Sequence, residues 1–429
     1  MMPKFLISST FLFIFYISSA VAQTVSIESI LATYLQDEKV ISAGAMANFS
    51  DALNYKLPAV KKLEFRLGIN GNNSPDTLDG SLRNEDYYSV NLTTNKWKEM
   101  KLQKKLKPIQ TNLYHKEQEM LITQALLDRY LVIVNLYYSL ESLKNRKELQ
   151  DLLLKKNDLL KQLLNDGVTI KITDALEIDK DLVQLFVILQ EEERDIDTYY
   201  ARLRQYFSSS DTFQVNFSDL ITMKKVIANT STLKYDSITS HPSLVYREAQ
   251  YQFAQANYNL EHIQNTNILN SFQLGYNRPV YNNEILKKFK PENTLTFRVG
   301  ISVPLTGNNN LNRNNANLEQ YNAMLNWQNA QAIQTKYIIL QDAKLNLTIK
   351  QYQAFEEIYK NSIVAKLLEN EKIMAQSTAL EILDLKIAKK KLELNLNSSA
   401  SNVMRNYLLL IESKGILNFD LRHQYLLEK

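Results

Sequence analysis

The sequence predicts a mainly helical protein in which one unit, a β-hairpin followed by long coiled-coil helices, occurs twice. Alternating apolar and polar residues mark two regions, around 63–92 and 272–303, and such alternation is typical of strands with one polar face. Nine glycines and eight prolines among 429 residues are too few for the loops of several ordinary domains. Long helices are therefore expected between the hairpins.

Residues 1–22 have the pattern of a secretory signal peptide. Lys4 precedes an apolar core at 5–17, and the sequence Ala-Val-Ala at 20–22 forms a cleavage pattern. We therefore expect an exported mature chain that begins at Gln23; a retained anchoring helix is the less favoured alternative. No other run approaches the ~20 apolar residues that a spanning helix needs. The chain has no cysteine, which excludes disulfides, cysteine-linked lipid and thiol chemistry.

The first repeat is predicted at residues 23–208. Its expected elements are a helix (25–55), two strands (63–69 and 88–92) around a polar loop (71–86), a long helix (96–164) with a packing seam for a partner helix, and a second helix (173–207). Pro108 is expected to mark the passage from strand to helix geometry, because proline fixes its own backbone angle. A break is expected at 165–167, where Asn-Asp-Gly occurs.

A polar, irregular connector is predicted at 209–239, followed by a second repeat at 240–416 and a C-terminal tail at 417–429. The expected order is again a helix, a strand near 272–276, a loop, a strand at 295–303, a long helix from about 312, a break at 375–377 and a final helix. Pro304 should mark the second strand-to-helix passage. Matched strand and helix segments, such as FRLG at 65–68 and FQLG at 272–275, lie about two hundred residues apart and indicate duplication.

A lone hairpin is not stable, and two hairpins supply only four strands. The strands are long enough to cross a bilayer when tilted, and an open sheet edge in lipid must be closed by further copies of the chain. Together with the signal peptide, this predicts a barrel in an outer membrane with helical rods in the periplasm. The alternative is a periplasmic coiled-coil structural or adaptor protein without a membrane barrel.

The sequence resembles the outer-membrane efflux protein family typified by TolC over about residues 25–416. The motifs that support the resemblance are NKWK (95–98), ITD (172–174), HPSL (241–244), SVPL (302–305) and LEILD (380–384). The resemblance implies a homotrimer with four strands per chain in a shared twelve-strand barrel, and a periplasmic α-helical tunnel. It also implies a passive conduit for efflux or type I secretion of small molecules or proteins, with an inner-membrane pump and a periplasmic adaptor as partners. The chain departs from the family pattern at 37–39 and at Ser377, which stands where an arginine is common.

Glu381 and Asp384 are the main candidate site residues, because their spacing places both on one side of the first turns of a helix. Repeated by symmetry they would form acidic rings at a periplasmic entrance, with Asp174 as a further candidate. The alternative is that Glu381 closes a capping box with Thr378. Trp97 is either a membrane-interface anchor or an ordinary packing residue.

Other functions have little support in the sequence. Its four histidines are scattered outside any metal-ligand spacing, and it has no phosphate-binding glycine loop and no nucleophile elbow, so neither an enzyme nor a cofactor is expected. A net charge of +4 gives no indication of nucleic-acid binding. The lysines at 104–105 and at 389–391 are expected to form solvated faces.

Overall fold

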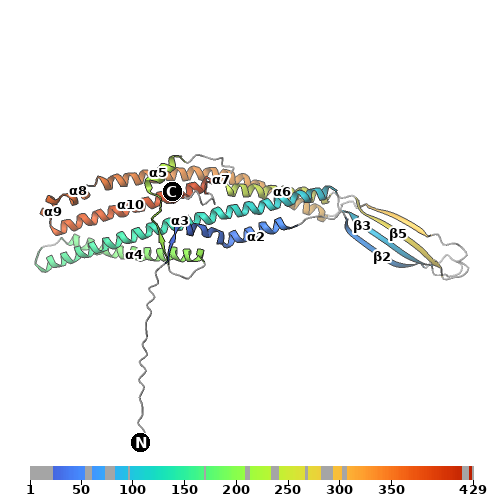
Figure 1. Ribbon diagram of the computed structural model, residues 1–429, viewed down its shortest axis with the longest axis horizontal. Coiled ribbons are helices and arrows are strands. Elements are labelled where there is room, and N and C mark those ends of the chain that lie inside the picture. Colours follow the sequence, from blue (N-terminus) through green and yellow to red (C-terminus); the bar gives the residue numbers. More distant parts are fainter. Residues whose placement is uncertain are drawn as a thin grey trace, which may run out of the picture.

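The computed structural model describes residues 23–53, 60–72, 83–94, 97–168, 171–207, 213–232, 241–265, 269–281, 293–301, 307–417 and 425–427. The molecule is elongated, with a β-sheet at one end and long helices that run away from it (Figure 1). The predicted signal peptide lies outside the described residues. The fold class is as expected, since each half has a hairpin between a short and a long helix.

The described residues of the first half form eight elements. They are β1 (Gln23–Ser26), α1 (Ile27–Ala32), the 3-10 helix η1 (Thr33–Gln36), α2 (Glu38–Ala52), β2 (Val60–Asn72), β3 (Arg83–Thr94), α3 (Trp97–Asn165) and α4 (Ile172–Phe207). Helix α3 has 69 residues, which at ~1.5 Å per residue gives a rod about 100 Å long. Its end is as predicted: Gly167 has a φ of 76°, and Val168 N–H donates to the Leu163 carbonyl at 2.9 Å, which closes a Schellman cap.

The remaining elements include a second hairpin and its helices. They are β4 (Phe213–Asn216), α5 (Met223–Thr232), α6 (Pro242–Asn265), β5 (Leu269–Tyr281), β6 (Thr294–Ile301), α7 (Gly307–Lys360), α8 (Ile363–Glu369), α9 (Glu371–Gln376) and α10 (Ala379–Ser413). The prediction of one helix from 312 to the break at 375–377 is wrong. Helix α7 already ends at Lys360, and Asn370 then separates α8 from α9, because its side chain accepts hydrogen bonds from Lys372 N–H and Ile373 N–H and so starts α9.

The two hairpins form one antiparallel sheet in the order β2-β3-β5-β6. In its register Phe65 pairs with Val90, Val90 with Leu274, and Leu274 with Phe297. The strands are longer than the alternation predicts, since residues 71–72 and 83–86 belong to β2 and β3 and not to the loop. Among the described residues, the edge strands β2 and β6 are each paired on one side only.

The long helices pack as a layer of neighbours. Helix α3 contacts α2, α4, α6 and α10, while α7 contacts α6 and α10. The order across the layer is therefore α4-α3-α10-α7 at the far end and α2-α3-α6-α7 next to the sheet. Helices α4 and α7 lie at opposite flanks of the chain.

The core lies midway along the molecule, where segments from the start, the connector and the end of the chain meet. Strand β1 pairs in parallel with β4, and Ile221 N–H donates to the Leu426 carbonyl at 2.7 Å. The connector is therefore less irregular than predicted. The predicted helix over 25–55 is also wrong, because Asp37 accepts a hydrogen bond from Lys39 N–H at 3.1 Å and begins α2 as a separate helix.

One described helix, α3, contains a stretch that is apolar enough to cross a membrane, and half of that stretch is buried within the chain. Leu126, Ile133 and Leu136 in α3 are at most 1% exposed and belong to the main core. We therefore assign this stretch to helix packing.

Candidate functional site

The sheet has one apolar and one polar face. Three apolar rows cross all four strands: Leu63, Leu92, Phe272 and Val299; Phe65, Val90, Leu274 and Phe297; Leu67, Tyr88, Tyr276 and Leu295. On the opposite face, the polar rows include Glu64, Asn91, Gln273 and Arg298. This separation follows from the period of two along each strand.

The apolar face is uncovered. Leu67 is 77% exposed, and Phe65 and Leu295 are each 71% exposed, although such side chains are normally buried. On the polar face, by contrast, Ser89 is only 4% exposed, and its hydroxyl has no partner among the described residues. The two faces therefore differ in exposure, and the apolar face is a hydrophobic surface larger than isolated exposed residues would explain.

Strand β3 ends at Thr94, and α3 begins at Trp97. The prediction for Pro108 is wrong, because this proline lies inside α3. It removes one backbone hydrogen bond, that to the Lys104 carbonyl, and a helix of 69 residues retains the others. Pro304 lies outside the described residues, between the end of β6 and the start of α7.

The three candidate entrance residues lie near the end of the molecule opposite the sheet, where α4 and α10 begin (Figure 1). Asp384 forms an ion pair with Lys156 of α3, with 2.5 Å between Oδ1 and Nζ. Asp174 accepts a hydrogen bond from the Thr173 hydroxyl at 3.4 Å. Glu381 closes the capping box at the start of α10, since Thr378 N–H donates to its Oε2 at 2.8 Å and Glu381 N–H donates back to the Thr378 hydroxyl at 3.3 Å.

Glu381 should make the start of α10 sensitive to acid. The hydrogen bonds from the backbone and hydroxyl of Thr378 lower the pKa of Glu381 below its ordinary value of 4.5. A lowered folded-state pKa means that the carboxylate stabilises the cap above pH 4.5 and that this stabilisation is lost as pH falls through the folded-state value. Hydrogen exchange at Thr378, corrected for the intrinsic rate, should accelerate from pH 6 to pH 3. Glu381→Gln, which has no titrating group, should lack this acceleration; an equal acceleration in both proteins would contradict the assignment.

The lysines at 389–391 are not simply a solvated face, which corrects the prediction. Lys390 Nζ lies 2.6 Å from Glu148 Oε2 of α3, and Lys391 Nζ lies 2.7 Å from Asp181 Oδ2 of α4. Neighbouring lysines of α10 therefore pair with two different helices. No local sequence pattern indicates these pairs, because the partners lie more than two hundred positions away.

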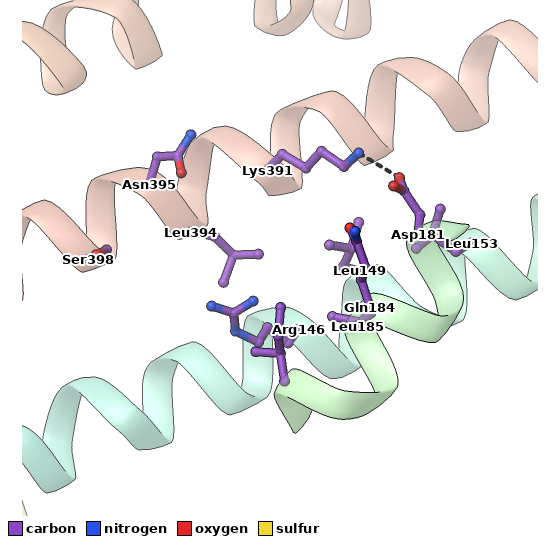
Figure 2. A pocket seen from close by; sticks show the side chains of 11 residues that line it. Arg146, Leu149, Leu153, Asp181, Gln184, Leu185, Lys391, Leu394, Asn395 and Ser398 are labelled. Carbon is purple, nitrogen blue, oxygen red and sulfur yellow. Dashed lines mark hydrogen bonds and ion pairs between the residues drawn. The ribbon is translucent and has the colours of Figure 1, made fainter. Parts of the chain in front are cut away.

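A cavity of about 400 Å³ lies between α3, α4 and α10 (Figure 2). Leu149, Leu185 and Leu394 are among the apolar side chains that line it, and the Lys391–Asp181 pair lies at its edge. A second, more polar cavity of about 240 Å³ shares Arg146 and other lining residues with the first. Leu149, Leu153 and Leu185 of the small apolar cluster near the helix ends line the first cavity.

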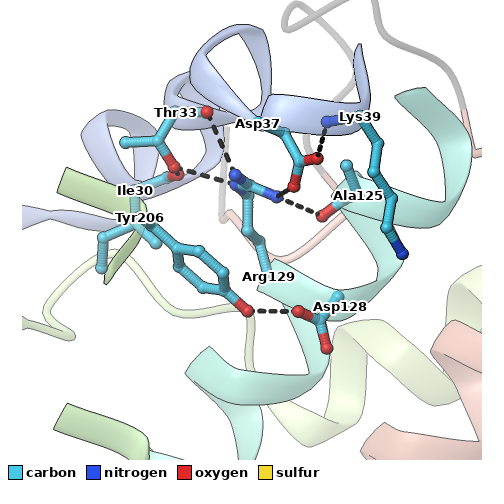
Figure 3. Close-up of polar contacts among 8 residues, drawn as sticks. All are labelled: Ile30, Thr33, Asp37, Lys39, Ala125, Asp128, Arg129 and Tyr206. Carbon is cyan, nitrogen blue, oxygen red and sulfur yellow. Dashed lines mark hydrogen bonds and ion pairs between the residues drawn. The ribbon is translucent and has the colours of Figure 1, made fainter. Parts of the chain in front are cut away.

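Arg129 is the largest fully buried side chain, and sequence reasoning missed it. Its guanidinium donates to the Thr33 carbonyl at 3.1 Å, to the Thr33 hydroxyl at 2.8 Å and to the Ala125 carbonyl at 2.9 Å (Figure 3). Its carbon Cζ also lies 4.3 Å from the ring centre of Tyr206 in α4. Arg129 therefore ties η1, α3 and α4 together. The sequence feature that could have indicated the burial of Arg129 is its position in an apolar stretch of α3.

The fold is that of bacterial outer-membrane channels. Similar solved structures include the outer-membrane channel OprN (TM-score 0.66, 11% identity, 91% of this chain and 89% of that chain). Another is the open state of the MtrE channel of Neisseria gonorrhoeae (TM-score 0.60, 12% identity, 91% of this chain and 88% of that chain). A third is the outer membrane protein VceC of Vibrio cholerae (TM-score 0.60, 10% identity, 91% of this chain and 96% of that chain). No family model and no curated protein matches the sequence. The four strands per chain and the long helices that the sequence resemblance implies are confirmed.

Proposed function

We propose that this protein is an outer-membrane duct, a passive conduit for small molecules or proteins driven by an inner-membrane pump. The observation that supports this most directly is the uncovered apolar face of the sheet. Strands of 8 to 13 residues suit a tilted crossing of the hydrocarbon core, which needs about 9 to 11. The polar face then lines the pore, as in other membrane barrels.

We further propose a homotrimer in which β6 of one copy pairs with β2 of the next. The strand order makes such a pair antiparallel, and three copies of four strands close a twelve-strand barrel. Closure removes the two edges, which lipid cannot solvate. The exported chain would begin at residue 23, and the repeats at 23–208 and 240–416 would each supply one hairpin and its share of the tunnel.

The flanking helices offer matching surfaces for this assembly. On α7, Ile333, Leu340 and Leu347 recur every seventh residue and are 65%, 49% and 57% exposed. On α4, Leu176 and Val183 are also seven residues apart and are 65% and 66% exposed. Such heptad spacing suits coiled-coil packing. We propose that α4 of one copy packs on α7 of the next, which continues the helical layer around a tunnel. A periplasmic adaptor would connect this tunnel to the inner-membrane pump.

Extraction of the mature protein from cell envelopes tests this function. We expect the protein in the outer-membrane fraction, release by detergent but not by carbonate, and three copies in each crosslinked particle. The apolar rows have no other cover within the described residues, so detergent should remain necessary after purification. A species that stays dispersed in water without detergent would instead support the coiled-coil structural or adaptor protein and would refute the duct.

The entrance residues give a second test. If Glu381 and Asp384 face the lumen, rings of carboxylates should concentrate cations there. Replacing both by alanine should then weaken cation block in planar bilayers and lower cation selectivity. Because Lys156 pairs with Asp384, Lys156→Gln should shift selectivity in the opposite direction, towards cations. Unchanged block with a lowered melting temperature in the double variant would leave Glu381 with the capping role alone.

A further inference from the structure

Four exposed lysines follow the sheet directly in the first turns of α3. Lys98, Lys101, Lys104 and Lys105 are all exposed, and no ion pair or side-chain hydrogen bond to them occurs within the described part of the chain. Lys107, by contrast, donates to the Asp51 carbonyl at 3.3 Å. The corresponding start of α7 reads GNNNLNR and contains no lysine. The basic cluster therefore comes from the first repeat alone.

The four lysines lie on the side of α3 that is turned away from α6. Glu99 is 8% exposed and accepts a hydrogen bond from Gln264 of α6 at 2.8 Å. At 3.6 residues per turn, Lys101 and Lys105 point roughly opposite to Glu99. The lysines therefore point away from α6.

Their distance from the sheet matches the headgroup layer of a membrane. β3 ends at Thr94 and α3 begins at Trp97, so Lys98 lies within one helical turn of the junction. From Lys98 to Lys105 the helix rises about 10 Å at ~1.5 Å per residue. A bilayer has a hydrocarbon core about 30 Å thick and measures roughly 40 to 45 Å with its headgroups. The lysines therefore begin where the apolar surface of the protein ends.

We propose that Lys98, Lys101, Lys104 and Lys105 form a binding site for the phosphate of anionic phospholipids in the periplasmic leaflet. This inference rests on the proposed insertion of the sheet into the outer membrane. Ammonium groups without carboxylate partners attract anionic headgroups, and each lysine near a charged membrane surface strengthens binding severalfold. The site would fix the depth of the barrel, because it is adjacent to the apolar band.

The full-length protein in nanodiscs tests the proposal. The probe is a four-to-one mixture of phosphatidylcholine and phosphatidylglycerol, and the lipids that remain bound after partial delipidation are counted by native mass spectrometry. We expect at least a fivefold enrichment of phosphatidylglycerol, which should fall as salt rises. Replacing the four lysines by glutamine should bring the enrichment close to one. The matched control replaces Lys155, Lys161, Lys171 and Lys180, which are also exposed but lie at the far end; it should keep the enrichment.

The outcomes separate this inference from the proposed function. A protein that does not enter nanodiscs refutes the duct. Insertion without phosphatidylglycerol enrichment, or equal enrichment in the wild type and the lysine variant, refutes the lipid site while the duct stands. Loss of the enrichment on addition of millimolar inorganic phosphate at constant ionic strength would identify a general phosphate site and would also overturn the proposal.

Discussion

Leu67→Arg is expected to prevent assembly in a bilayer, whereas Gly68→Arg should leave assembly intact. The two residues are neighbours in β2 and lie on opposite faces of the sheet. Leu67 belongs to an apolar row, and an arginine near the middle of the membrane on the lipid side costs about 2 to 4 kcal/mol. At Gly68 a new Cβ would meet nothing within 4 Å, and the side chain would point into the polar interior.

The measurement is the fraction of protein recovered as a detergent-resistant oligomer after insertion into liposomes. Because every copy carries the substitution, the cost is repeated around the barrel and the Leu67→Arg oligomer should be nearly absent. Equal yields for the two variants would mean that the apolar face does not contact lipid. A loss confined to Gly68→Arg would assign the two faces the other way round.

Arg129→Met is expected to lower the free energy of unfolding by about 3 to 5 kcal/mol. Methionine preserves much of the apolar stem but removes every donor, so the carbonyls of Thr33 and Ala125 lose their bonds from the guanidinium. The guanidinium also donates to the Asp37 carboxylate at 3.4 Å, and the loss of hydrogen bonds from a buried charged group costs more than the loss of neutral ones. Chemical unfolding in detergent, followed by circular dichroism, would measure the loss.

Arg405→Met provides the control for this prediction. Arg405 is an exposed residue of α10, so its replacement should change stability by less than about 0.5 kcal/mol. If both variants unfold at the same denaturant concentration as the wild type, Arg129 does not hold η1, α3 and α4 together.

The sheet was predictable because its signal is local. Alternation in one strand identifies a polar and an apolar side without knowledge of the partner strands, and Phe65 and Phe297 follow it. The lengths of α3 and α4 were also predictable, because Gly167 marks their turn. The duplication added information, since the second hairpin repeats the pattern of the first.

Other features depend on distant partners or on small energy differences. Arg129 and Thr33 are 96 positions apart, so no local pattern indicates that they meet. The ion pair between Lys156 and Asp384 is hidden for the same reason. The prediction for Pro108 was wrong because proline is usually excluded from helix interiors, where it costs about 3 kcal/mol. The packing of a long helix can offset this cost.

The two halves of the helical end differ in mechanical stiffness. On the α3–α4 side each helix runs without a break, and only the one hydrogen bond that Pro108 removes is missing from the ladder of α3. On the other side the ladder is interrupted after Lys360 and again at Asn370. A continuous helix resists bending along its whole length, whereas an interrupted one rotates where the ladder stops. A force applied at this end should therefore rotate α8 and α9 about these two interruptions, while α3 and α4 keep their shape.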